Sequence, residues 1–130
     1  MGYNMSNDVA LGQLGSGFVD DTGAVTPPTG KVIVAVTFLS DLRLDSSEGL
    51  VAELPTDDTF KGPTFDDSGT ARSSINSFGS TAQTTANGGN SETVDSSNVF
   101  PKGLTIYGRW RSFLLSAADS TGGAILYYGY

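Results

Sequence analysis

The sequence predicts an all-β fold, an antiparallel β-sandwich or jelly-roll, on three observations. KVIVAVTFL at 31–39 is apolar and largely β-branched at successive positions, which is typical of a strand covered on both faces. The segments 104–116 and 124–130 are rich in β-branched and aromatic residues, which strands favour. No segment keeps apolar residues at the three-and-four spacing of a helix between capping residues. We therefore expect strands and no helix.

The length of 130 residues fits one domain. Residues 1–17 are polar and glycine-rich, and we expect them to form an extended N-terminal arm. Residues 18–130 are then a single β domain, with a short strand in LVAEL at 50–54 that ends before a proline. Inside this domain the composition changes to Ser, Thr, Gly and Asn, which predicts a long polar loop at about 57–98.

We expect 104–116 and 124–130 to pair as an antiparallel hairpin across the turn between them. Strict alternation along the first strand would place apolar side chains on one face and a mixed set on the other. The first set is Leu104, Ile106, Trp110 and Leu114, and the second is Tyr107, Arg109, Arg111 and Phe113. Gly108 interrupts the strand and indicates a bulge. The residues expected in the core are Val32, Val34, Val36, Phe38, Ile106 and Trp110.

The charge and the missing residue types exclude several function classes. Seven basic residues against 14 acidic ones give a net charge of −7, whereas nucleic-acid and anionic membrane surfaces attract basic proteins. The chain has no cysteine and no histidine, so it lacks thiolate chemistry and the usual general base near neutral pH. No apolar run approaches the ~20 residues that span a bilayer. We predict no catalytic residue, cofactor or metal ligand, and neither a nucleic-acid nor a membrane partner.

Three of the seven basic residues flank the only tryptophan, within residues 102–111. We expect Lys102, Tyr107, Arg109 and Arg111 to lie at contacts with other protein chains. Arginine is enriched at interfaces, and its planar guanidinium suits a carboxylate from a neighbouring copy. In the alternative interpretation both arginines are solvated and only the tryptophan is buried.

A second class, an enzyme, rests on a repeated carboxylate turn. Asp21-Thr22-Gly23 and Asp67-Ser68-Gly69 both match the Asp-Thr/Ser-Gly signature of aspartic proteases, in which two facing carboxylates share a proton. The same spacing is ordinary turn chemistry, because Asp accepts a hydrogen bond from the main chain two residues on. The doubled acids at 20–21, 57–58 and 66–67 offer oxygens to calcium, but no twelve-residue loop with a closing Glu follows them.

Two blocks of the chain, 6–41 and 98–129, carry the patterns GxLGSGF and FPxGxTIYGRW. In these blocks the chain resembles small virion proteins of marine tailed bacteriophages, especially those that infect cyanobacteria. The resemblance implies a structural protein on the outer capsid surface, a decoration or cement protein whose partners are the major capsid protein and further copies of itself. A tail, collar or fibre position, including adhesion to a host, is the alternative within this class. The resemblance brings no catalytic residues.

Overall fold

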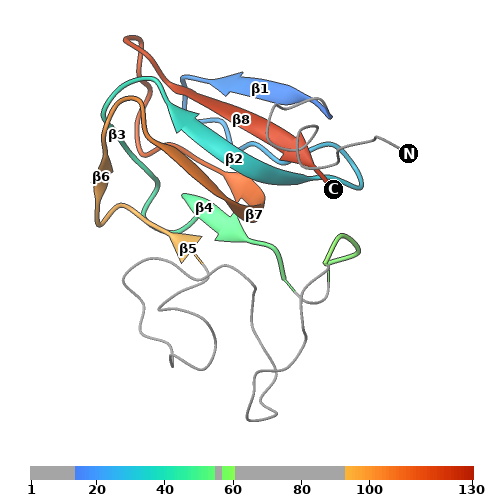
Figure 1. Cartoon of the computed structure of the whole chain (residues 1–130). Helices are drawn as coiled ribbons and strands as arrows, with labels where there is room; N and C mark the ends of the chain where they lie inside the picture. Colours follow the sequence, from blue (N-terminus) through green and yellow to red (C-terminus); the bar gives the residue numbers. More distant parts are fainter. Residues whose placement is uncertain (1–13, 55–56, 61–92) are drawn as a thin grey trace.

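The computed structural model describes residues 14–54, 57–60 and 93–130, which fold into antiparallel β-sheets (Figure 1). The chain is all-β in this part, as predicted, and no described segment is a helix able to cross a membrane. The main sheet has six strands in the order β1-β8-β2-β7-β4-β5, and a second sheet pairs β3 with β6. The strands are β1 (Ser16–Val19), β2 (Val32–Phe38), β3 (Leu42–Arg43), β4 (Leu50–Ala52), β5 (Thr93–Val94), β6 (Val99–Phe100), β7 (Thr105–Phe113) and β8 (Ala124–Gly129).

Strand β2 lies between β7 and β8, and all of its residues except Thr37 are buried. This confirms the prediction of a strand covered on both faces. It also shows that the predicted hairpin is wrong, because β7 and β8 each pair with β2 and not with each other. The local pattern predicted β7 and β8 correctly as strands, but it did not predict that β2 lies between them. The most apolar strand takes this central position, where a neighbouring strand pairs with each of its edges.

The core lies on one face of the main sheet. It includes Val36 and Phe38 from β2, Trp110 from β7 and Leu126 from β8, all fully buried. The small second sheet closes this side: Leu42 of β3 is buried in the core, and Phe100 of β6 stacks on Phe38 with ring centroids 5.2 Å apart. Burial of apolar surface in this cluster stabilises the fold.

The side chains of β7 do not alternate strictly between the two faces of the sheet, because the strand pairs with β2 and β4 in irregular register. Between β2 and β7, Val34 alone stands opposite two residues, Gly108 and Arg109, so the bulge expected at Gly108 is confirmed. The pairing of β4 with β7 skips Arg111. Trp110 and Phe113 therefore share the core face, and the prediction that Phe113 lies on the other face is wrong.

The predicted core residues Val32, Val34, Val36, Phe38 and Trp110 are all buried, and Ile106 is partly buried against the core cluster. Val32 and Val34 lie outside that cluster, because β2 also shifts register against β8 between Ile33 and Ala35.

The predicted arm and loop fall largely outside the described residues, which omit 1–13, 55–56 and 61–92. Ser16 and Gly17, expected in the arm, begin β1. Gly17 faces the core side, where a Cβ would stand 2.6 Å from the hydroxyl oxygen of Tyr128. Thr93–Val94, expected in the loop, form β5 at the end of the main sheet.

Candidate functional site

The strand register defines the outer face of the main sheet, the face turned away from the core. Phe18 of β1 pairs with Ile125 of β8, which pairs with Thr37 of β2, which pairs with Thr105 of β7. Two residues along, a second row contains Ser16, Tyr127, Ala35 and Tyr107. Because paired residues share a face and alternate residues return to it, all eight lie on one surface. We call this surface the open half of the outer face.

The open half exposes aromatic side chains and carries no charged residue. Phe18 is 60% exposed and Tyr107 is 66% exposed, and these are two of the four large hydrophobic residues found exposed among the described residues. The hydroxyls of Thr37 and Thr105 hydrogen-bond across the strands at 2.8 Å. On a chain with a net charge of −7, this surface offers apolar contact without local charge repulsion.

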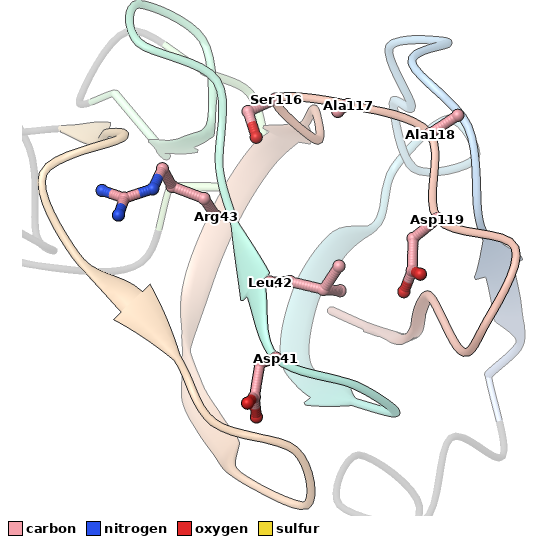
Figure 2. A pocket seen from close by; sticks show the side chains of 7 residues that line it. All are labelled: Asp41, Leu42, Arg43, Ser116, Ala117, Ala118 and Asp119. Carbon is pink, nitrogen blue, oxygen red and sulfur yellow. The ribbon is translucent and has the colours of Figure 1, made fainter.

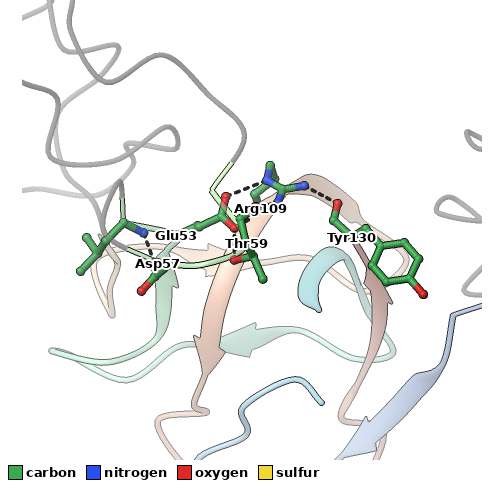
Figure 3. A network of polar contacts seen from close by, with 6 residues as sticks. Glu53, Asp57, Thr59, Arg109 and Tyr130 are labelled. Carbon is green, nitrogen blue, oxygen red and sulfur yellow. Dashed lines mark hydrogen bonds and ion pairs between the residues drawn. The ribbon is translucent and has the colours of Figure 1, made fainter. Parts of the chain in front are cut away.

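The rest of the outer face, near β4 and the middle of β7, holds a buried ion pair (Figure 3). We call it the closed half. The guanidinium of Arg109 donates from Nε to Oε1 of Glu53 at 2.7 Å and from Nη2 to Oε2 at 3.0 Å, a two-pronged contact. The Glu53 side chain is fully buried, whereas that of Arg109 is 20% exposed. The main-chain N–H of Glu53 also donates to the carbonyl of Arg109, so the two residues are joined twice.

Arg109 also binds two segments that are distant in sequence. Its Nη2 donates to the carbonyl of Thr59 at 2.8 Å, and its Nη1 donates to the main-chain oxygen of Tyr130 at 2.5 Å. The hydroxyl of Thr59 donates to Glu53, and the carboxylate of Asp57 accepts the Leu54 N–H at 2.8 Å. One guanidinium therefore holds residues 57–60 and the end of β8 together over this half of the sheet.

The four predicted contact residues do not form one cluster. Tyr107 lies in the open half. Arg109 is engaged by Glu53 of its own chain, so the expectation that it meets a carboxylate of a neighbouring copy is not retained. Arg111 is exposed on β7, and Lys102 is exposed in the turn that precedes β7, where its N–H donates to Asp41.

Sequence reasoning missed Glu53, although its position carried a signal. It is the only charged residue in the apolar strand segment LVAEL, and a carboxylate in such a segment needs a cationic partner. Phe18 was also missed as an exposed residue, because its outward direction depends on the register of β1 with β8.

The carboxylate turn at Asp21 serves its own backbone. Oδ1 of Asp21 accepts the N–H of Gly23 at 2.9 Å in an exposed turn. The second copy of the motif, at 67–69, lies outside the described residues. Within residues 14–54, 57–60 and 93–130, no three acidic side chains gather in a group that could hold a metal ion.

A shallow depression of about 220 Å³ lies between β3 and the loop that follows β7 (Figure 2). It is lined by Asp41, Leu42, Arg43, Ser116, Ala117, Ala118 and Asp119. Its acidic side chains already have partners. Asp119 accepts hydrogen bonds from the hydroxyl of Ser40 and from both the hydroxyl and the N–H of Thr121. These bonds, that of the Ser40 hydroxyl first, hold the pKa of Asp119 well below its usual range, so this carboxylate is no proton donor or acceptor near neutral pH.

No family model, curated protein or solved structure matches the chain. The candidate site is therefore defined by the chemistry of the outer face alone.

Proposed function

We propose that the chain is a structural virion protein without enzymatic activity, which binds other protein chains through the open half. The observation that carries the proposal is the exposure of Phe18 and Tyr107 on the open half, whose eight residues are all uncharged. Large aromatic side chains dominate the energetics of protein interfaces, and exposed apolar patches mark interaction sites. The resemblance to phage virion proteins supports the choice of a particle as the setting.

In this proposal the protein is a capsid decoration protein that bridges subunits of the major capsid protein on the outer surface. Each copy contributes a modest contact, and many copies acting together reinforce the shell against internal pressure. Lys102 and Arg111 lie at the rim as exposed cations, where they would set register and association rate more than affinity. A tail, collar or fibre position would use the same surface, and a density map of the intact particle distinguishes these positions.

The test is incorporation of Tyr107→Glu into particles that lack the protein. A carboxylate in the middle of the apolar contact would be desolvated on docking, so we expect at least about a tenfold loss of bound copies. Val99→Glu is the matched control, because Val99 is also an exposed apolar residue but belongs to the second sheet. Both variants should unfold at the urea concentration of the parent protein.

Normal incorporation of Tyr107→Glu together with Phe18→Glu would reject the open half as the docking surface. Cleavage of unstructured peptides at acid pH by the purified protein, abolished in Asp21→Asn, would replace the proposal with the enzyme alternative.

A further inference from the structure

Strand β1 is at one end of the main sheet, and in the described part of the chain only β8 pairs with it (Figure 1). The carbonyl of Gly15 accepts the N–H of Tyr128 at 2.9 Å, so the main-chain groups of Gly15 point toward β8. In an antiparallel ladder this direction alternates along the strand. The N–H and C=O groups of Ser16 and Phe18 therefore point away from β8, toward the edge.

We propose that this edge pairs with β1 of a second copy, antiparallel and about a twofold axis at Gly17. Ser16 of each copy then stands opposite Phe18 of the other. Such a pair exchanges both of its N–H to C=O bonds, so all four edge groups of each copy are satisfied. An unpaired edge strand is a ready template for this kind of association.

The side chains fit this register, because each large residue meets a small one. On the outer face Phe18 would lie beside Ser16 of the second copy. On the core face Val19 would meet Gly15, and Gly17 would meet its own symmetry mate with no side chain on either copy. Paired residues share a face, so the outer faces of both copies lie on the same side of the joined sheet.

In each neighbouring register, a carbonyl that the new pairing needs already accepts a hydrogen bond. A shift by two residues in one direction recruits Asp20, whose carbonyl already accepts the N–H of Asp119 at 2.8 Å. The opposite shift recruits Leu14, whose carbonyl already accepts Nζ of Lys31 at 2.7 Å. The main-chain hydrogen bonds of the register centred on Gly17 need only Ser16 and Phe18, which both belong to β1.

The lack of charge on β1 and the small size of the open half favour a second copy as the partner that pairs with this edge. In a chain of net charge −7, the segment Ser16–Val19 is uncharged, so two copies approach there without placing acids opposite each other. The open half has eight residues, of which Ala35 is buried, and this is well below the roughly 20–30 a side of a standard interface. The joined sheet brings two open halves onto one continuous surface, which goes beyond the proposed function and gives it a larger docking area.

The first experiment is sedimentation of the full chain over a range of concentrations, which should show a monomer–dimer equilibrium. Ser16→Pro removes an N–H group at the edge and leaves the hydrogen bonds between β1 and β8 intact. In a symmetric dimer this substitution removes two intermolecular hydrogen bonds, one from each copy. We expect dimerisation to weaken by about tenfold or more. Ser16→Ala keeps the N–H and should dimerise like the parent. Should Ser16→Pro fail to fold, Phe18→Lys replaces it, since an edge lysine opposes pairing.

The second experiment tests the register by disulfide cross-linking. Because the chain has no native cysteine, only the introduced thiols can form a cross-link. An oxidised mixture of Ser16→Cys and Phe18→Cys chains should cross-link several-fold more than either variant alone. Preferential cross-linking of Phe18→Cys with itself would overturn the register. A parent protein that sediments as a monomer up to about 1 mM would overturn the dimer. Tyr107→Glu should still dimerise while failing to incorporate, so the two proposals fail separately.

Discussion

The two halves of the outer face belong to one sheet but contain opposite chemistry. In the closed half, the buried carboxylate of Glu53 is neutralised by Arg109, which also holds the main chain at Thr59 and Tyr130. In the open half, Phe18 and Tyr107 are exposed and no charge is present. Among residues 14–54, 57–60 and 93–130, segments of the chain therefore cover one part of the sheet, whereas aromatic side chains stay exposed on the other part. This difference separates residues that maintain the fold from residues available for binding.

The largest expected effect is that of Arg109→Ala, which would test the closed half. Removing the guanidinium leaves Glu53 buried without its cation and releases the carbonyls of Thr59 and Tyr130. We expect the free energy of unfolding to fall by about 3 kcal/mol. This is the lower end of the range for breaking a buried ion pair, because Arg109 is partly exposed. Urea unfolding measures it. Arg111→Ala on the same strand is the control, and equal losses for both variants would show that the closed half is not held by its ion pair.

A smaller effect is expected from Asp119→Asn, because this carboxylate has several hydrogen bonds but is accessible to solvent. The bond from the Ser40 hydroxyl, the two from Thr121 and that from the Gly123 N–H lower the pKa of Asp119 from 3.8. A carboxylate whose pKa is lower in the folded state stabilises the fold at pH values above its unfolded pKa of 3.8. This contribution is lost as the pH falls from 3.8 toward the folded-state pKa. Asp119→Asn should therefore flatten the acid side of a plot of unfolding midpoint against pH. An unchanged acid limb would show that Asp119 does not cause that dependence, and Asp45→Asn would be tested next because the pKa of Asp45 is also lowered.

The smallest effect on stability is expected from Tyr107→Ala in the open half. The side chain is 66% exposed, so its removal should change the free energy of unfolding by no more than about 0.5 kcal/mol. Thermal and urea unfolding of the same sample measure it. A loss comparable with that of Arg109→Ala would mean that Tyr107 is a structural residue and that the two halves do not differ in role.

The fold class and its central strand could be predicted because they depend on local composition. The run of β-branched residues in β2 is apolar whatever its partners are, so a strand covered on both faces follows from the residues alone. The neighbours of β2 could not be predicted, because β7 and β8 resemble each other in composition and their pairing depends on long-range contacts. Local pattern located Gly108 as a bulge but not Arg111, which has no glycine to indicate one.

The candidate site was predicted in part. Tyr107 was selected from the sequence and lies exposed on the outer face. Arg109 was selected for the same reason, yet its partner is Glu53, 56 residues earlier in the chain. No local rule connects these two residues, since the contact exists only once β4 has paired with β7.

The skipped position at Arg111 has one consequence for how β7 tolerates change. Replacing this side chain does not change the number of residues between Trp110 and Phe113. Phe113 therefore still pairs with Leu50 and Val25. Deleting the residue would bring Phe113 one step nearer to Trp110 and turn its ring from the interior toward water. At this point of the strand the fold depends on the spacing and not on a particular side chain.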